Sequence, residues 1–322
     1  MTHILSKSTS DATAALQTVV TSNLKLSHRN ALFGVFSVFV LALGAQTIRE
    51  LIKLGSDWSN SHASQILVVP FITAWLLWLR RKTVFQNSRV SIRSGTAVMA
   101  LGGLLLVFGK TGAAQLNAND HLSLMTAAFV VLWVGGFLLI HGTAAFRKAL
   151  FPLLFLFLAV PIPTAVLDWL IGILQAGSAD MAYGLIRLSG TPVYRDGFIF
   201  KMPDLVIEVA PACSGIRSAI AIFISGLVAG HLFLRSTWKK LLLLSVAIPV
   251  LFFKNAVRIA VLSVIAVRWD KQVLTSSLHH DGGVLFFGLG LCLLCPVLVR
   301  LIKSERVLQK RDSLVRHTQL AN

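Results

Sequence analysis

A cysteine stands where a polar loop meets a long apolar segment, a setting that suits nucleophilic chemistry. Cys213 lies in the run VAPACSGIRS over residues 209–218. The start of a helix offers unpaired N–H groups and a positive dipole end, and both favour the thiolate, which is the nucleophilic form of cysteine. Arg217 follows four residues later on the same helical face and adds positive charge, whereas Ser214 is expected to cap the helix. The alternative is that Cys213 is a small apolar residue that only packs.

Two further reactive positions lie in or beside later apolar segments. Arg258 is about ten residues from the end of its segment, or roughly 15 Å along a helix. An ionisable side chain inside a span is costly and indicates a functional site by default. Asn255 stands one turn before it on the same face, where it can orient the guanidinium group or a substrate carbonyl. His279 and His280 come just before the last apolar segment. The alternative for Arg258 is a structural ion pair with one of three acids, Asp168, Asp204 or Glu208.

The composition decides which elements must carry these residues. Hydrophobic residues make up 55% of the 322 residues and charged residues only 13%, and the mean hydropathy is +0.76. These values are typical of a membrane protein and exclude a soluble globular domain. We predict an all-α polytopic protein with about eight transmembrane helices, at residues 30–48, 65–79, 95–112, 122–142, 149–163, 212–233, 240–266 and 282–302. The segment 65–79 is short, and Trp75 and Trp78 are expected to anchor it at the interface.

The segment before the sixth span differs from the others. Residues 164–190 carry Asp168, Asp180 and Arg187 among apolar residues, which predicts an amphipathic helix on the membrane or against the bundle; a ninth span is the alternative. Residues 191–211 alternate apolar and polar around an Arg-Asp-Gly turn, which predicts a small β-hairpin. We therefore divide the chain into a cytoplasmic tail (1–29), a transmembrane domain (30–303, with 164–211 outside the cytoplasm) and a basic cytoplasmic tail (304–322).

Positive charge orients these segments. The formal net charge is +17, and with eight spans Lys and Arg are roughly twice as frequent in the cytoplasmic loops as in the outer ones. The protein is then expected in the cell membrane with both termini on the cytoplasmic side, and no cleaved signal peptide is expected. This orientation places residues from three separate spans at the outer face of the membrane: Cys213, Arg258 and the His279–His280 pair. Basic residues at the cytoplasmic surface, which can contact anionic lipid, account for the net positive charge, so we expect no nucleic-acid partner.

A series of motifs follows in a fixed order along most of the chain. The motifs are Ser61-His62 with Val68-Val69-Pro70 and Trp78-Leu79-Arg80-Arg81, Phe151-Pro152 through Pro161-Ile162-Pro163, Gly190-Thr191-Pro192-Val193 with Arg195-Asp196-Gly197, ACSGIRS at 212–218, Pro249 with Asn255 and Arg258, and Leu278-His279 with Gly282-Gly283. Together they resemble the exosortase/archaeosortase family of multi-spanning membrane enzymes, although Ala63 stands where the family usually has glycine.

The resemblance implies a cysteine protease or transpeptidase. Cys213 matches the family's nucleophile, Arg258 its catalytic arginine and His279 its catalytic histidine, with His280 as the alternative. His62 then contacts substrate or lies at the headgroup level. The implied substrates are exported proteins whose C-terminal tail holds a short PEP-like motif, a transmembrane helix and a basic cluster. The implied acceptor is an envelope glycan or lipid, or water, in a bacterium that exports polysaccharide.

Other functions find less support in the sequence. The His, Cys and acidic residues show no zinc spacing, and there is no nucleotide motif, so no metal or other cofactor is expected. Cys292 and Cys295 form a CxxC pattern among leucines, where we expect packing residues and no redox site. Two rivals remain. A transporter or flippase would use Arg258 to bind an anionic envelope precursor, and a catalytically silent assembly partner would need none of the polar residues.

Overall fold

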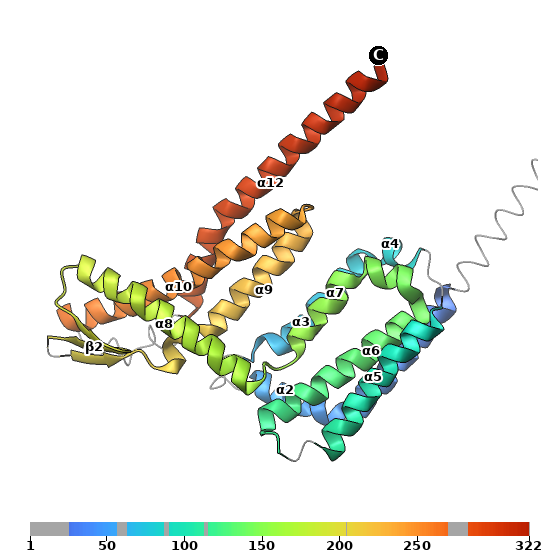
Figure 1. Ribbon diagram of the computed structural model, residues 1–322, viewed down its shortest axis with the longest axis horizontal. Helices are drawn as coiled ribbons and strands as arrows, with labels where there is room; N and C mark the ends of the chain where they lie inside the picture. The colour runs from blue at the N-terminus through green and yellow to red at the C-terminus, as the bar shows by residue number, and fades with distance from the viewer. Residues whose placement is uncertain are drawn as a thin grey trace, which may run out of the picture. The chain divides into compact units, whose positions relative to one another are not determined.

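The computed structural model describes residues 26–56, 63–86, 90–112, 115–203, 205–269 and 283–321. This part of the chain is mostly helical, with one small antiparallel sheet (Figure 1). The chain divides into two compact units, Met1–Thr164 and Ala165–Asn322. The candidate site residues Cys213 and Arg258 belong to the second unit.

The first unit is a group of apolar helices. After the helix Leu26–Leu43 it contains α2 (Ala45–Ser56), α3 (Gln65–Leu79), α4 (Arg81–Phe85), α5 (Ile92–Thr111), α6 (Ala118–Lys148), α7 (Leu150–Phe155) and the 3₁₀ helix η1 (Leu156–Ala159). The long helix α6 provides much of its core, where Phe137 packs with Val134, Val84 and Leu153. The helix α3 has the bounds predicted from sequence, and its Trp75 and Trp78 are exposed.

Helices α5 and α6 pack closely because glycines line their contact. A Cβ atom at Gly102 would lie 2.7 Å from the backbone nitrogen of Leu132, and one at Gly135 would lie 2.7 Å from that of Met99. Small residues let helix backbones approach in a membrane, where apolar side chains gain little by leaving lipid. The next glycine, Gly103, has no described atom within 4 Å of such a Cβ.

This contrast gives a test of the packing. We expect Gly102→Leu to destabilise the protein by about 2 kcal/mol or more, because the new side chain has to separate two backbones. Gly103→Leu is the matched control, since it brings the same gain in helix propensity into open space. Thermal unfolding of the purified protein in detergent measures both. Equal melting temperatures for the two variants would contradict the close approach of α5 and α6.

A proline-rich bend ends the first unit. The apolar segment predicted as a span at 149–163 is helical only to Ala159, because Pro161 and Pro163 cannot continue the hydrogen-bond ladder. The first turns of α6 hold the bend through Asn119 Nδ2 to the Ile162 carbonyl (2.9 Å), Ser123 Oγ to the Pro161 carbonyl (2.8 Å), and the Thr164 N–H to Asp120 Oδ1 (2.6 Å).

The second unit combines helices with the small sheet. It contains α8 (Thr164–Leu188), β1 (Tyr194–Asp196), β2 (Ile199–Met202), β3 (Leu205–Glu208), the 3₁₀ helix η2 (Pro211–Ser214), α9 (Ile216–Phe233), α10 (Thr237–Arg268) and α12 (Gly283–Ala321). The predicted hairpin is confirmed as β1 and β2, with Gly197 at φ 60° in the turn. A third antiparallel strand, β3, which the prediction missed, extends it to a sheet in the order β1-β2-β3.

The sheet packs against α8 and the C-terminal half of α10. Phe200 of β2 is fully buried in a cluster with Ala179 and Ile186 of α8 and with Ala256 and Ile259 of α10. Figure 1 shows the strands beside the far end of α10 (orange). The alternating burial of β2 follows from this one-sided contact, because successive strand residues point to opposite faces.

Helices α9, α10 and α12 form the rest of the second unit. Ile222, Leu243 and Leu294, one from each helix, meet in a second buried cluster. At the turn between α9 and α10, the carboxylate of Glu305 accepts the N–H groups of Arg235 (2.9 Å) and Ser236 (2.8 Å). These contacts fix α12 to the α9–α10 hairpin at the end away from Cys213.

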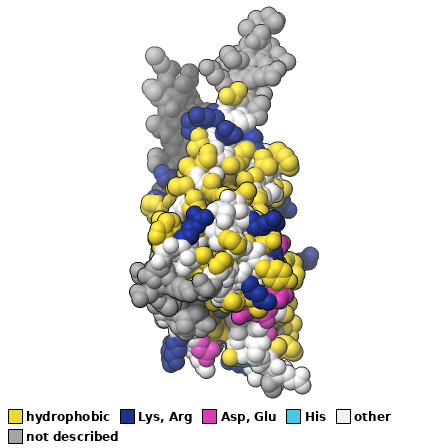
Figure 2. Space-filling view, turned by 90° about the vertical axis from the view of Figure 1, so that its left-hand side faces the viewer, with side chains coloured by type: hydrophobic (Ala, Val, Ile, Leu, Met, Phe, Trp, Pro, Cys, Tyr) yellow, Lys and Arg dark blue, Asp and Glu magenta, His cyan; other side chains and the backbone are white. Residues whose placement is uncertain are grey.

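The surface of the described residues is that of a multi-pass membrane protein. Hydrophobic side chains (yellow) cover much of the face in Figure 2, and many large hydrophobic residues are exposed among the described residues. Among the described residues, six helices are long and apolar enough to cross a membrane, or seven elements if the bent pair around 160–163 counts as one span. The predicted number of eight is therefore not confirmed. The helix predicted at 164–190 is present as α8, and its two predicted placements, on the membrane or across it, remain predictions.

Candidate active site

Cys213 lies in a short 3₁₀ turn and not in the first turn of the apolar helix. Its N–H group donates to the carbonyl of Ala210 (2.8 Å), so this N–H is not free. Gly215 follows at φ 72° and ψ 20°, a left-handed conformation that separates the 3₁₀ turn from α9. The thiol is half-buried and free of any disulfide. A distinct loop, here called the nucleophile turn (residues 211–218), therefore carries Cys213.

This conformation corrects two sequence predictions. Arg217 was placed on the same helical face as Cys213, but the left-handed residue Gly215 interrupts the helix between them, so the four-residue spacing no longer aligns the two side chains. Ser214 was expected to cap α9. The capping position belongs to Gly215, and the buried Ser214 hydroxyl has no hydrogen-bond partner among the described residues.

Asn255 of α10 holds the nucleophile turn directly. Its Nδ2 donates to the carbonyl of Cys213 (2.9 Å), and the side chain is buried, with 2% of its surface exposed. The contact arises because α9 and α10 are antiparallel, so that the start of α9 lies beside the residues of α10 near Asn255. Asn255 was predicted to orient a guanidinium group or a substrate carbonyl; in the structure it binds the backbone of the nucleophile turn.

A glycine is required at position 215 for two separate reasons. Its positive φ is disfavoured for any residue with a Cβ atom. In addition, a Cβ there would lie 2.6 Å from Asn255 Oδ1 and 3.3 Å from Lys254 Nζ. The backbone of the turn can thus approach α10 closely only because residue 215 has no side chain.

Helix α8 and the sheet fix the chain that enters the nucleophile turn. Gln175 of α8 donates its amide to the carbonyl of Val209, and the N–H of Val209 donates to the carbonyl of Phe198 (2.9 Å). Cys213 itself packs against the buried cluster formed by α8, the sheet and α10. A side chain held on rigid elements keeps its position relative to its neighbours, which covalent catalysis would require of a nucleophile. Gln175 was not predicted, since a lone amide in an apolar segment gives no signal of its own.

Arg258 extends the same face of α10 by one turn. It is half-buried, and it follows Asn255 by three residues, a spacing that places both side chains on one side of a helix. Helix α10 continues for about three turns beyond Asn255, alongside the sheet. Of the acids considered as structural partners of Arg258, two are exposed (Asp168 and Glu208) and the third, Asp204, lies outside the described residues.

The comparison with protein families decides what kind of protein carries this site. The family model described as transmembrane exosortase matches residues 58–296, which is well over half of the chain and includes the whole nucleophile turn. The chain belongs to the transmembrane exosortase family. Searches of curated proteins and of solved structures give no match.

Three predicted site residues of this exosortase, His279, His280 and His62, lie outside the described residues. Helix α12 begins at Gly283, a few residues after the histidine pair in the chain. That helix passes close to α10, since a Cβ at Gly290 would lie 3.8 Å from Lys254 Cγ. No group of three His, Cys, Asp or Glu residues that could hold a metal ion occurs in the described part of the chain.

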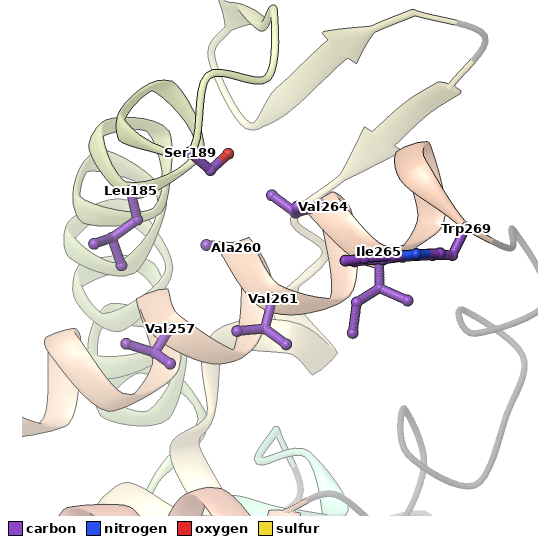
Figure 3. Close-up of a pocket in the computed structure, with 8 residues that line it drawn as sticks. All are labelled: Leu185, Ser189, Val257, Ala260, Val261, Val264, Ile265 and Trp269. Atoms are coloured by element: carbon purple, nitrogen blue, oxygen red, sulfur yellow. The ribbon is translucent and has the colours of Figure 1, made fainter.

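An apolar groove runs along the C-terminal half of α10, beginning at Val257. It has a volume of about 360 Å³. Figure 3 shows Val257 and Val261 along α10, Leu185 on the neighbouring α8, and Trp269 at the far end. Val257, where the groove begins, directly precedes Arg258 in the chain. The remaining residues that line it are Ser189, Ala260, Val264 and Ile265.

Proposed function

We propose that this exosortase is a membrane cysteine protease or transpeptidase that removes the C-terminal sorting tail of exported proteins. The observation that carries the proposal is the nucleophile turn, in which buried Asn255 fixes the backbone of Cys213 against the helix that bears Arg258. Family membership supports the same activity. The site is proposed to face outward from the cell inner membrane, with both termini in the cytoplasm.

The proposed reaction proceeds through a covalent intermediate. The Cys213 thiolate attacks the scissile carbonyl, forming a C–S bond and a tetrahedral oxyanion that Arg258 stabilises. Collapse of this species breaks the C–N bond, and His279 (or His280) protonates the departing amine of the tail. The thioester then reacts with a hydroxyl or amine of an envelope glycan or lipid, or with water. The same histidine accepts the proton of that nucleophile, and the thiolate is regenerated.

The substrate tail is proposed to consist of a PEP-like motif, a transmembrane helix and a basic cluster. The apolar groove supports lateral entry, because an apolar helix lying along α10 would bring the residues before it to Arg258. Removal of the tail then releases the exported protein from its membrane anchor. The basic cluster would remain at the cytoplasmic side, in accordance with the positive-inside rule.

A mass-spectrometric experiment tests this function. The exosortase is co-expressed with an exported protein that carries such a tail, and the products are analysed for tail removal and for added mass from an acceptor. A protein fragment attached to Cys213 and released by hydroxylamine would establish the thioester. Tail removal with no adduct on any cysteine, even after rapid acid quenching, would count against the covalent step.

The groove gives a separate prediction. We expect Val261→Trp to raise KM for tail removal by about tenfold with kcat little changed, because filling the groove weakens binding in the ground and transition states alike. Val261 is 40% exposed, so the larger side chain does not disturb the buried cluster. Ile248→Trp on the same helix is the matched control, because Ile248 is also exposed and does not line the groove. Equal KM values for the two variants would exclude the groove as the docking place of the tail.

A further inference from the structure

A buried lysine lies directly behind the nucleophile turn, and the reaction described above does not use it. Lys254 is 1% exposed, and its Nζ donates to the hydroxyl of Ser218. The Ser218 hydroxyl in turn donates to the carbonyl of Gly215 (3.0 Å). A chain of two hydrogen bonds therefore connects the ammonium group to the left-handed residue of the turn.

The charge of Lys254 is not balanced by an ion pair within the described residues. Its neighbour one turn later on the same face is Arg258, which carries charge of the same sign. Burying an ammonium group in a membrane-spanning helix is costly, and the cost rises when no carboxylate accompanies it. Such a residue indicates a functional requirement more than a packing one.

A second buried lysine on α10 shows the contrast. Lys239 also contacts a serine, through Nζ to Ser304 Oγ (3.2 Å). It lies near the start of α10, however, where the carboxylate of Glu305 is close enough to be stabilised by its charge, although the two form no ion pair among the described residues. The two lysines therefore share helix, burial and type of partner, and they differ in the balance of their charge and in their distance from Cys213.

We propose that Lys254 is a positioning residue for Cys213, an inference that rests on the proposed cysteine chemistry. Adjacent residues of a helix point about 100° apart, so Lys254 and Asn255 bind the nucleophile turn at two different places. Asn255 holds the carbonyl of Cys213, and Lys254 holds that of Gly215 through Ser218. The ammonium group also places positive charge behind the turn, where the thiolate forms and, during the reaction, the oxyanion.

The test measures the reactivity of Cys213 without any substrate. The chain has three cysteines, and replacing Cys292 and Cys295 with serine leaves Cys213 as the one thiol. In this background we expect Lys254→Met to slow alkylation of Cys213 by iodoacetamide in membranes by about tenfold at neutral pH, the effect of losing one nearby charge. Lys254→Arg keeps the charge and is expected to retain most of the rate. The kcat for tail removal is expected to fall with the alkylation rate, at unchanged KM.

The matched control is Lys239→Met, which is expected to leave both rates at the parental value. Parental or faster alkylation in Lys254→Met would overturn the inference, and so would an equal loss in Lys239→Met. If Lys254→Met does not accumulate in the membrane, Ser218→Ala decides instead. It breaks the hydrogen-bond link to Gly215 and leaves the charge in place, so a smaller loss of the alkylation rate is expected; a parental rate in that variant overturns the inference. Alkylation needs no tail, so a failure of the proposed function, seen as tail removal by Cys213→Ala, is distinguishable from a failure of this inference.

Discussion

Cys213→Ala is expected to abolish tail removal, lowering the rate by at least about 10³-fold, because the reaction loses the atom that forms the covalent intermediate. The fold should persist. Cys213 is half-buried in a turn whose backbone is fixed by hydrogen bonds from Asn255 and to Ala210, and neither bond involves the thiol. The measurement is mass spectrometry of a co-expressed tail-bearing protein, at equal amounts of parent and variant in the membrane.

The chain provides its own control for this experiment. Cys292 and Cys295 are free and exposed on α12, and their replacement by alanine is expected to leave the rate unchanged. Unchanged tail removal in Cys213→Ala would exclude the cysteine mechanism. If Arg258→Gln alone impaired the function of the protein, the rival interpretation as a transporter of an anionic envelope precursor would be favoured, because such a protein needs the cation and not the thiol.

Much of the fold could be predicted from hydropathy, because long apolar runs and alternating patterns depend on local sequence. The helix α3 and the β1–β2 hairpin are examples. The third strand β3 escaped prediction because its four residues form a strand only by pairing with β2, a contact that no local pattern encodes. The early end of the helix before Pro161 was a missed local signal, since the prolines are visible in the sequence.

The site was predicted by residue type more than by geometry. Cys213 and Asn255 lie at similar distances along the chain from the short turn between α9 and α10, and the antiparallel packing of these helices brings the two residues together. The alignment of Arg217 with Cys213 was wrong because it assumed an unbroken helix across Gly215. Lys254 was overlooked as a site residue, although the argument that singled out Arg258, an ionisable group inside a span, applies to it equally.

Gly215→Ala is expected to cost about 10²-fold in the rate of tail removal, because it displaces the nucleophile turn from α10. The methyl group would have to occupy a left-handed conformation and would lie 2.6 Å from Asn255 Oδ1 and 2.9 Å from its Cγ. Asn255 is buried, so it cannot swing into open space, and its hydrogen bond to the Cys213 carbonyl would be lost or stretched. A shift of about 1 Å in a reacting group is enough for a loss of this size.

Strain and crowding can be separated by a second glycine. Gly197 in the β1–β2 turn also has a positive φ, 60°, but no described atom lies within 4 Å of its expected Cβ. Gly197→Ala therefore carries the same kind of backbone strain, about 1–2 kcal/mol, and is expected to lower the melting temperature while leaving the rate near the parental value. A comparable loss of rate in both variants would mean that general destabilisation, and not the position of Cys213, explains the effect.

A double-mutant cycle then identifies the group against which the methyl collides. If the collision is with Asn255, Asn255→Ala removes the obstacle and the hydrogen bond together, so adding Gly215→Ala to it is expected to cost far less than Gly215→Ala costs in the parent. Rates of tail removal for the parent, the two single variants and the double variant give the coupling. Additive losses would mean that the two residues act independently, and the close contact of residue 215 with α10 would then not be what positions Cys213.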